Sequence, residues 1–559
     1  MGYPSFVSTT WETSFDRLRP TAATLLRLCA FLAPDPIPDG MFESQKEAMA
    51  GACELLRSET GQEDGADSIQ EALAELESCS LISRQEATFT VKQAVQEVLQ
   101  SRIPPERLTD WTEASLKIVN GFAPLQANDV RTWPVWNGLR PHAERVVLLA
   151  DKEGLTGPTS ELMSRLGNYL KTRGLYTDAE PLLRRALAIA EASFGSEHPD
   201  VAIHLNNLAV LLRDTNRLSE AEPLLRRVLA IDEASFGSEH PKIAIRLNNL
   251  ARLLQDTNRF SEAEPLMRRV LAIDEASFGS EHPEVAMDLN NLAQLLKDTN
   301  RLSEAEPLIR RALAIYEASF GSEHPQVAVS LNHLATLLQD TNRLSEAEPL
   351  VRRALDIEET SFGSDHPRVA TSLNNLAQLL KATNRLSEAE PLMRRALDID
   401  EASFGSEHPK VAITLSNLAT LLQDTNRLSE AEPLMWRALS IDEASLGEHP
   451  NVAIRLNHLA DWFQGTNRHS EAEPLMRRAL DIDEASFGSQ HPEVAIHLNN
   501  LATLLQATNR LSEAEPLMRR AVEIFERSLG PDHPNTKIVQ ENLSALSEEI
   551  ALGASNRPR

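Results

Sequence analysis

The fold is decided by residues 201–242, which read VAIHLNNLAVLLRDTNRLSEAEPLLRRVLAIDEASFGSEHPK. This unit recurs almost unchanged to the C-terminus, and each copy closes with a His-Pro pair. The copies are 42 residues apart except for one step of 41, where SFGSEHP becomes SLGEHP around Leu446. A fixed period of this length is typical of a solenoid, in which each repeat packs on its neighbours. The prolines that mark the period are Pro199, Pro241, Pro283, Pro325, Pro367, Pro409, Pro450, Pro492 and Pro534.

The first half of the unit is predicted to be a helix followed by a tight turn. Its apolar residues Val201, Leu205, Leu208 and Leu212 are spaced by four, three and four, which places them on one helix face. Residues 215–217 contain no apolar side chain and are expected to form the turn.

The second half is predicted to be another helix. Ser219 is expected to cap its N-terminus, with Glu222 completing a capping box. Pro223 would then fall in the first turn, where a missing N–H costs little. Gly237 follows the helix, where a left-handed cap requires a residue without Cβ. The apolar positions of this helix are Ala221, Leu225, Val228 and Ile231.

The pattern of small and large residues resembles the tetratricopeptide repeat (TPR). The 42-residue length, the LNNLA core, the AEPL segment and the HP loop are similar to the longer variant in kinesin light chains and many bacterial multi-repeat proteins. AEP occurs nine times, so the resemblance implies an all-α fold: a right-handed superhelical solenoid of nine helical hairpins over residues 156–534. A capping helix is expected at 535–552, with a disordered tail at 553–559. The residues that carry the pattern are Leu205, Leu208, Ala209, Leu212, Ala221, Leu225 and Val228.

Composition narrows the possible functions. The 559 residues have a net charge of −27, much of it built into the repeat, which disfavours nucleic-acid binding and favours a basic partner. Three widely spaced cysteines do not indicate a disulfide framework or a metal site. Neither a signal peptide nor a transmembrane run is recognisable, so a cytoplasmic location is expected.

The first 155 residues do not follow the repeat pattern. Helices are predicted at 10–18, 21–32 and 68–78, followed by a β-hairpin within 81–91, which together suggest a small winged-helix-like α+β domain at 1–100. Residues 9–38 and 89–100 resemble the winged-helix segment of STAND NTPases, the signal-transduction ATPases related to the NB-ARC class. Residues 131–147 resemble the helical connector that joins this segment to TPR arrays, which implies a connector at 101–155.

Two departures from the STAND pattern bear on function. The chain has no G-x-x-x-x-G-K-[ST] loop to hold phosphates, so no nucleotide cofactor is expected. Lys92 stands where the family usually has the His that can sense nucleotide. A natural truncation, a split gene or a mis-called start would each account for the missing NTPase domain. The helix before the hairpin carries Glu71, Glu75 and Glu77 without Lys or Arg, which is wrong for reading a DNA groove.

The sequence therefore predicts a non-catalytic scaffold that binds a protein or peptide. It is interpreted as the sensor part of a STAND-type signalling protein, with an NTPase partner bound through residues 1–155 and no membrane or nucleic-acid partner. The alternatives are a free-standing adaptor like the kinesin light chains and a truncated annotation of a full STAND ATPase. No nucleophile–base arrangement and no metal-ligand spacing is present.

Two adjacent Asn columns are the candidate ligand-binding residues. Asn inside a helix costs roughly 0.5 kcal/mol relative to Ala, so its repetition requires a reason. The resemblance implies that these positions lie on the concave face, where an amide can bond both the N–H and the C=O of an extended peptide. The alternative is a structural ladder between repeats. The peptide-binding candidates are Asn206, Asn207, Asn248, Asn249, Asn290, Asn291, Asn332, Asn374, Asn375, Asn417, Asn457, Asn499 and Asn500.

Three variable columns on or near the same face are the candidates for specificity, against the alternative of neutral drift. They begin at His204, Val210 and Arg213, and the residues expected to select a ligand are Arg213, Arg246, Arg252, Gln294, Lys297, Gln378, Lys381 and Arg455.

Copy eight carries Trp462 and Phe463 where other copies have Leu, and copy seven has Trp436 for Arg. Local repacking or an aromatic-lined pocket would explain these residues. The His-Pro histidines, such as His240, are interpreted as loop-packing or backbone-bonding residues rather than metal ligands.

Overall fold

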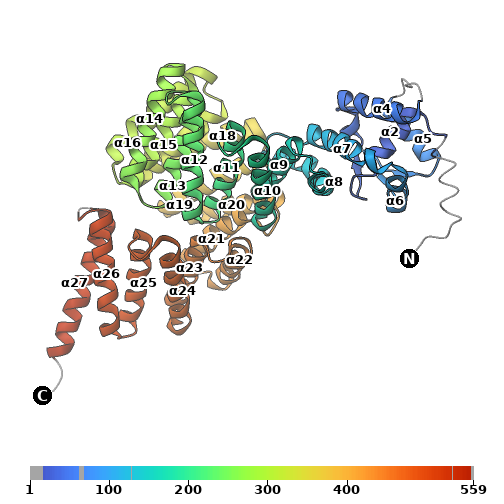
Figure 1. Cartoon of the computed structure of the whole chain (residues 1–559). Coiled ribbons are helices and arrows are strands. Elements are labelled where there is room, and N and C mark those ends of the chain that lie inside the picture. The colour runs from blue at the N-terminus through green and yellow to red at the C-terminus, as the bar shows by residue number, and fades with distance from the viewer. Residues whose placement is uncertain (1–14, 16, 62–67, 128, 532, 556–559) are drawn as a thin grey trace. The chain divides into compact units, whose positions relative to one another are not determined.

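The computed structural model describes residues 15, 17–61, 68–127, 129–531 and 533–555, with side chains described as far as residue 551. It divides into two compact units, residues 1–208 and 209–559, which are considered separately (Figure 1). The helix predicted at 10–18 lies almost wholly outside the described residues, as do residues 556–559 of the predicted tail.

The N-terminal part of the first unit is a small helical domain with a three-stranded antiparallel sheet of order β1-β3-β2. Ile37 pairs with Phe89 and Ile82 with Val91, which makes the predicted hairpin β2–β3 and adds β1 on its other side. Phe42 packs on Phe89 with ring centroids 6.0 Å apart. The elements are α2 (Pro20–Cys29), β1 (Ile37–Pro38), α3 (Gly40–Glu43), α4 (Lys46–Thr60), α5 (Ile69–Ser78), β2 (Ile82–Arg84), β3 (Thr88–Val91) and α6 (Gln93–Arg102).

Two long helices follow this domain and lead to the first repeat. Trp111 and Trp136 are both fully buried, and Trp136 stacks on Tyr169 of the first repeat with ring centroids 5.0 Å apart. These aromatic contacts cover the apolar side of the first helix pair, which has no preceding repeat to pack on. The segments are η1 (Pro105–Arg107), α7 (Leu108–Phe122), η2 (Val130–Thr132), α8 (Trp133–Lys152), α9 (Gly157–Thr172) and α10 (Tyr176–Phe194).

From α9 to α26 the described chain consists of nine successive pairs of helices, as the period predicts (Figure 1). The first helix of each pair is called helix A and the second helix B. After α9 and α10, the A helices are α11 (Pro199–Asp214), α13 (Pro241–Asp256), α15 (Pro283–Asp298), α17 (Pro325–Asp340), α19 (Pro367–Ala382), α21 (Pro409–Asp424), α23 (Pro450–Gly465) and α25 (Pro492–Ala507). The B helices are α12 (Leu218–Phe236), α14 (Phe260–Phe278), α16 (Leu302–Phe320), α18 (Leu344–Phe362), α20 (Leu386–Phe404), α22 (Leu428–Leu446), α24 (His469–Phe487) and α26 (Leu511–Ser528). The C-terminal helix is α27 (Pro534–Ser555).

The ends of each helix are set by residues that repeat with the period. Helix A starts at the proline, because proline has the φ of a first helical residue and no N–H to satisfy. The preceding His240 caps it by accepting a hydrogen bond at Nδ1 from the Lys242 N–H at 3.2 Å. The turn between the helices has Asn216 at φ +57°, and Gly237 after helix B has φ +85°. The predicted turn is thus confirmed, and Gly237 ends the helix as predicted with a positive φ, although its ψ of 156° is extended rather than left-handed helical.

The predicted start of helix B was wrong. Helix α12 begins at Leu218 rather than after Ser219, and no side chain caps it. Pro223 consequently lies inside the helix, in its second turn, rather than in the first turn. Glu222 does not close a capping box, because it accepts hydrogen bonds from Arg226 at 2.9 Å and from Arg259 of the next repeat at 2.8 Å.

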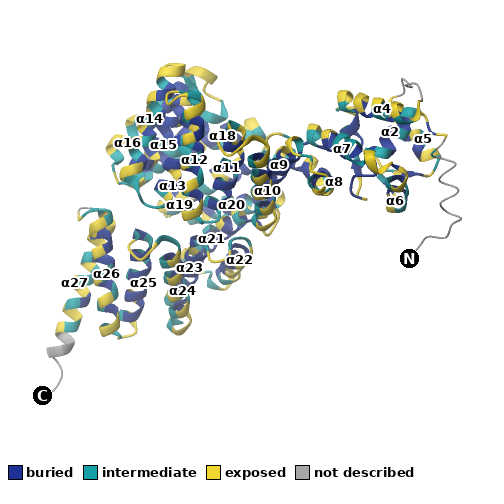
Figure 2. Ribbon diagram, viewed as in Figure 1, coloured by how far each residue is buried: buried dark blue, intermediate teal, exposed yellow. Residues whose placement is uncertain are grey.

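Each repeat buries apolar residues against both neighbours. Leu289 of α15 packs with Ile315 of α16 and with Leu331 of α17, all buried in one cluster. Figure 2 shows dark blue along the facing sides of the helices and yellow at many of the loops and outer surfaces. Small residues such as Ala286 and Ala312 in the same cluster let the helices approach closely.

Charged side chains join the repeats at the surface. The turn residue Arg259 donates from Nε to Glu262 at 2.7 Å and from Nη1 to Glu222 of the preceding repeat at 2.8 Å. Burial opposes the charge on Glu222, yet the hydrogen bonds from Arg226 and Arg259 bring the pKa of its carboxyl below the ordinary value. The same bridge recurs as Arg301–Glu264, Arg343–Glu306, Arg385–Glu348, Arg427–Glu390, Arg468–Glu432 and Arg510–Glu473.

Among the described residues, no helix has both the length and the apolar composition that crossing a membrane requires.

The left-handed turn provides a direct test of this account. Changing Asn342, which has φ +56°, to Ala is expected to lower the free energy of unfolding by about 1 kcal/mol, because Ala bears the Cβ clash of this conformation without the local hydrogen bonding by which the Asn side chain offsets it. Asn342→Gly is the matched control and should be close to neutral. Urea denaturation followed by circular dichroism measures both, and equal stability of the two variants would contradict the assignment.

Candidate functional site: the surface of the A helices

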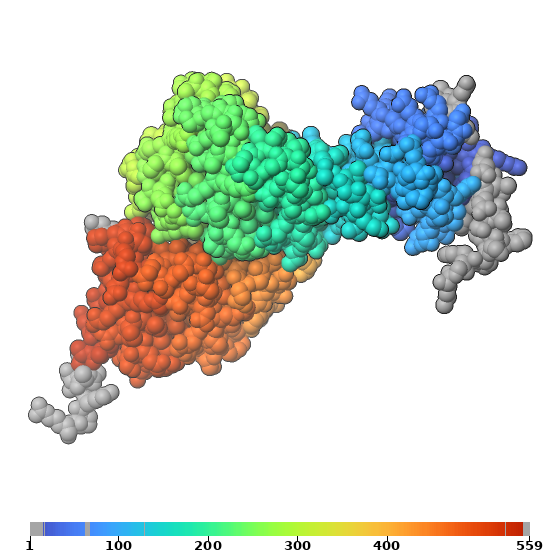
Figure 3. Space-filling model, in the orientation of Figure 1, coloured from blue at the N-terminus to red at the C-terminus, as the bar shows by residue number. Residues whose placement is uncertain are grey.

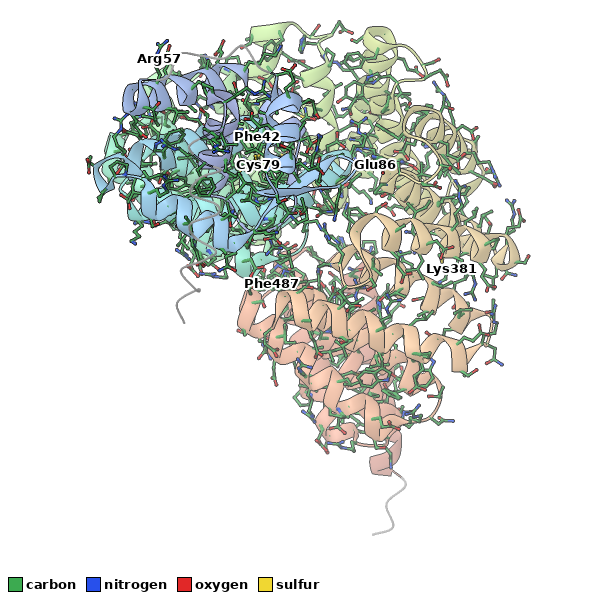
Figure 4. All side chains as sticks on the ribbon, turned by 90° about the vertical axis from the view of Figure 1, so that its right-hand side faces the viewer. Phe42, Arg57, Cys79, Glu86, Lys381 and Phe487 are labelled. Carbon is green, nitrogen blue, oxygen red and sulfur yellow. The ribbon has the colours of Figure 1, made fainter. Side chains whose placement is uncertain are left out.

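The A helices lie on the inside of the curved stack. Successive A helices approach one another, for example α15 with α17 and α17 with α19, in addition to packing on the B helices. Charged side chains one and two repeats away also act on His333, because Lys297 and Arg252, after burial, contribute to lowering the pKa of its imidazole. The A helices therefore present a concave surface, and all side chains of the unit are drawn in Figure 4, where Lys381 of α19 is labelled.

The second Asn column lies half-buried on this surface. Asn291 accepts a hydrogen bond from Arg252 at 3.1 Å and donates to Asn248 of the preceding repeat at 3.4 Å. Its members among the candidates are Asn207, Asn249, Asn291, Asn375, Asn417 and Asn500, all half-buried.

The first Asn column lies deeper and links neighbouring repeats. Asn290 donates to Ser330 at 2.9 Å, Asn332 to Ser372 at 3.0 Å and Asn374 to Thr414 at 3.2 Å. At the end of the array Asn499 accepts from Asn542 of α27 at 2.9 Å. Asn290 and Asn457 are buried, whereas Asn206, Asn248, Asn332, Asn374 and Asn499 are half-buried. The structural-ladder alternative thus describes the observed contacts of this column.

The variable column that begins at His204 does not face the concave surface. Arg246 donates to Asp232 at 2.7 Å and Arg455 to Asp442 at 2.9 Å, with exposed side-chain fractions of 16% and 8%. The same position pairs with an acid on the preceding B helix in other repeats: Ser372 with Glu358, Thr414 with Asp400 and His497 with Asp483. The expectation that Arg246 and Arg455 read a ligand from this surface therefore needs correction, because both are enclosed between helices.

The other two variable columns do reach the surface. Arg252, Gln294 and Gln378 are exposed, and Arg252 hydrogen-bonds the Asn291 amide oxygen. The last column is half-buried and bonds to acids of the next repeat: Arg213 with Asp256, Gln255 with Asp298, Lys297 with Asp340 and Lys381 with Asp424.

An aliphatic column on the same surface was missed by the sequence reasoning. Ile245 lies four residues before Asn249 and seven before Arg252, so the three share one helix face. Its side chain is 57% exposed, although it is a large apolar residue. The sequence signal was present, because an aliphatic residue recurs with the period at a position off the buried face. The exposed members are Ile203, Ile245, Met287, Ile413, Ile454 and Ile538, and Thr371 occupies the same position.

The aromatic residues of copies seven and eight pack on one another. Trp462 and Phe463 are buried with ring centroids 5.1 Å apart, and Trp436 lies edge-on to Phe463 at 6.4 Å. Arg468 covers Phe463, with Cζ 4.3 Å from the ring centroid. The rings therefore fill space between repeats, which is the repacking alternative.

The His-Pro histidines act on the backbone, as interpreted from the sequence. Besides capping helix A, each stacks on the aromatic residue four positions earlier where one is present, as His324 does on Phe320 at 4.3 Å. In the part of the chain that the structure describes, no group of three His, Cys, Asp or Glu side chains is placed to hold a metal ion.

One repeat places two acids together at the buried column. Asp288 faces Asp274, so two carboxyl groups meet where five other repeats pair an acid with Arg, Ser, Thr or His. Both residues are buried, and burial together with the neighbouring Asp274 raises the pKa of Asp288 to about 8. Two buried carboxyl groups that face each other cannot both ionise cheaply, so they share a proton.

This pair makes stability depend on pH. Because the pKa of Asp288 is raised on folding, the folded chain holds a proton that the unfolded chain releases, and stability falls as the pH rises from about 4 to about 8. Asp288→Ser, which copies Ser330 and Ser372, is expected to stabilise the chain by about 1–3 kcal/mol at about pH 8 and by less at about pH 6. Urea denaturation at both pH values measures the difference.

The matched control is Ser372→Ala, which leaves Glu358 without the hydroxyl that donates to it at 2.6 Å. This variant should lose stability where Asp288→Ser gains it. A stabilisation by Asp288→Ser that does not vary with pH would contradict the shared proton.

The fold and this surface define a solenoid of paired helices with a polar and aliphatic concave face. A tetratricopeptide repeat family model matches residues 158–234, 220–276, 242–318, 289–360, 326–402, 388–444, 410–485, 456–527 and 493–550. The chain belongs to the tetratricopeptide repeat family. A model of a domain of unknown function, DUF7779, matches residues 13–108.

Solved structures with similar folds include other repeat proteins. A crystal structure of Podosopora anserina putative kinesin light chain nearly identical TPR-like repeats is 28% identical, with a TM-score of 0.33, and the match covers 36% of this chain and 96% of that one. BtubC (BKLC) from P. vanneervenii is 22% identical, with a TM-score of 0.33 and coverages of 44% and 94%. A STAND protein with a tetratricopeptide repeat sensor from Pyrococcus horikoshii is 13% identical, with a TM-score of 0.45 and coverages of 86% and 66%. Comparison with curated proteins finds no match.

Proposed function

We propose that the chain is a non-catalytic scaffold that recognises an extended segment of a protein partner on the surface of its A helices. The observation that carries this proposal is the exposed aliphatic column beside the half-buried Asn column. Soluble proteins seldom expose apolar side chains in a continuous row, and such a row marks an interaction surface. Repeats of the family to which the chain belongs generally bind proteins or peptides.

The two columns have complementary roles in this proposal. Aliphatic side chains such as Ile245 and Ile413 supply apolar contact with alternate side chains of the bound segment. Amides such as Asn249 and Asn291 hydrogen-bond its backbone, which is independent of its sequence. Arg252, Gln294 and Gln378 are exposed next to them and vary between repeats, so they would select among partners.

The contacts within the protein support keeping some of the candidates in this proposal. Asn290 is buried and bonded to the next repeat, so it stabilises the array. The second column, Arg252, Gln294 and Gln378 stay in the binding surface. Lys297 and Lys381 are ion-paired to Asp340 and Asp424 of the next repeat.

We infer further that residues 1–100 form a winged-helix-like domain, joined by a connector at 101–155 to repeats at 156–534 and a cap at 535–552. The order α2, β1, α4, α5, β2, β3, with β1 hydrogen-bonded to β3, supports this inference. Such a domain would dock on a P-loop NTPase of a STAND-type system. Size-exclusion chromatography with nucleotide-binding proteins from the same genome tests the docking, and the absence of any association would count against it.

The aliphatic column can be tested without disturbing the core. Ile245→Thr and Ile413→Thr copy Thr371, which the array already carries at this position. A peptide selected from a display library on the wild-type chain is expected to bind the double variant at least about tenfold more weakly, since each buried aliphatic contact contributes about 1–2 kcal/mol. Fluorescence anisotropy measures the affinity.

The control is Trp436→Arg, which removes an exposed apolar side chain from a B helix and restores the residue of the other repeats. It should leave the affinity unchanged. A triple variant of Asn249, Asn291 and Asn375 to Ala should weaken binding of the same peptide. Equal affinity of the wild type and the aliphatic variant would exclude the surface as the binding site.

A further inference from the structure

One loop of the array differs from the others in length and conformation. The loop between α22 and α23 lacks one residue, because SLGEHP replaces SFGSEHP. Its glycine, Gly447, has φ 65° and ψ −137°, whereas Gly405 and Gly488 of the neighbouring loops have φ 92° and 83° with ψ 153° and 156°. The chain therefore follows a different path at this loop.

The histidine of this loop, His449, has no phenylalanine on which to stack. Elsewhere the ring stacks on a phenylalanine four residues earlier, as His408 does on Phe404 at 4.8 Å. The shortened loop has Leu446 instead, only three residues before His449. His449 still caps α23, because its Nδ1 accepts from the Asn451 N–H at 3.0 Å.

His449 also faces a hairpin turn far away in the sequence. It lines one cavity together with Asp214 and Asn216, at the turn between α11 and α12. Burial lowers the pKa of His449 to about 4, against the effects of the Asp214 and Asp483 carboxylates, so the ring is neutral at physiological pH. Two successive turns of the superhelix are therefore close together at this point, and Figure 3 shows the green part of the chain in contact with the orange part.

Two cavities flank this contact. One of about 690 Å³ is lined by Asp214, Arg252 and Phe260 from one turn of the superhelix and by His449, Ile454 and Glu493 from the next. The other, of about 600 Å³, is lined by Arg217 and Arg259 on one side and Glu448 on the other. Asn216, Leu218 and Phe487, the last labelled in Figure 4, line both cavities.

Residues that break the repeat pattern gather on both sides of the contact. Phe260 stands where most copies have Leu, and Arg252 where others have Val, Gln, Thr or Asp. On the opposite side the pattern is broken by the missing residue and by Leu446. In addition, Arg478 donates to the Glu448 carboxylate at 3.1 Å, whereas its counterpart Arg437 donates to the Ser406 carbonyl.

We propose that the shortened loop 446–450 and the turn 214–218 form an intramolecular clasp that holds successive turns of the superhelix together. A loop of the usual length, with its histidine stacked on phenylalanine, would leave no ring free to reach Asp214. The clasp closes the space between the turns, and its opening lengthens the superhelix and widens the cavity beside Arg252 and Ile454.

The proposal concerns the shape of the array and does not depend on any bound partner. A solenoid without contacts between turns behaves as a spring, because each repeat contacts only its neighbours. The His449 ring beside the Asp214 turn, and the Glu448 carboxylate in a cavity shared with Arg217 and Arg259, make contacts weak enough to open reversibly. With the clasp, the array therefore has two discrete conformations, closed and open, instead of a continuous range of shapes.

Pulsed electron spin resonance on the full chain tests the clasp. Spin labels are attached at Ser261→Cys and Ala444→Cys, both exposed positions outside the two cavities, with Cys53 and Cys79 changed to Ser. The wild-type background should give a narrow distance distribution. His449→Asn keeps the helix cap, since Asn is a strong N-cap residue, but cannot reach Asp214. It should shift the mean to a longer distance and at least double the width of the distribution.

A second variant restores the usual loop by changing Leu446 to Phe and inserting Ser after Gly447, and it should open the array in the same way. His366→Asn makes the same chemical change in a loop of ordinary length and should leave the distances as in the wild type. Circular dichroism checks that each variant is folded, and His449→Asn alone decides the matter if the insertion prevents folding. A distance distribution in His449→Asn identical to that of the wild type would overturn the clasp.

Discussion

The structure depends on one constraint: each pair of helices is apolar on two sides, and only neighbouring pairs can cover both. Leu289 contacts the cluster shared with α16 and α17, and the same cluster takes in Ile357 of α18. Full burial of one such side chain is worth about 1.5–3 kcal/mol, whereas a surface ion pair contributes about 0–1 kcal/mol. Burial between repeats therefore supplies the stability, and the bridges such as Arg259–Glu222 fix how one repeat is placed against the next.

The same constraint explains the two ends of the array. At the N-terminal end Trp136 and Tyr169 cover the first pair, in place of a preceding repeat. At the C-terminal end α27 continues the ladder through Asn542, which bonds Asn499, while most of its remaining side chains are polar or exposed. A terminal helix with a polar outer side stops the stacking that the apolar sides of internal repeats would otherwise continue.

The interior also contains polar groups that must be satisfied in each repeat. In five repeats one buried position carries a donor, such as Arg246, Ser372 or Thr414, that bonds an acid thirteen or fourteen residues earlier. Replacing one partner alone leaves a buried polar group unpaired, which costs about 1–3 kcal/mol. Variation at this position follows from the internal pairing, and it is not evidence of ligand selection. The Asp274–Asp288 pair brings two acids together, and the folded protein accommodates them by keeping a proton.

Periodicity predicted the helices, the asparagine turns, the glycine after helix B and the role of the His-Pro residues, because all of these depend on contacts within one repeat. It failed where a side chain meets another repeat. The spacing within one repeat predicts that Glu222 is a cap residue. It does not reveal the actual partner, Arg259, which lies 37 residues away in the next repeat. Arg246 and Arg455 were assigned to a surface because helical spacing gives the direction of a side chain but not the distance to the next helix.

The proximity of His449 to Asp214 cannot be predicted from the sequence of one repeat, because it depends on the rise of the superhelix over several copies. Small rotations between repeats add up along the stack, so whether two turns touch is set by every interface between them. In an array of near-identical copies, most interfaces repeat the same rotation, and the position of contact is fixed. The residues at that position are then free to depart from the pattern without disturbing other repeats. The repeat pattern is broken on the two surfaces that face each other, at Phe260 on one side and at Leu446 and the shortened loop on the other. A change in sequence at these surfaces can alter the shape of the whole array.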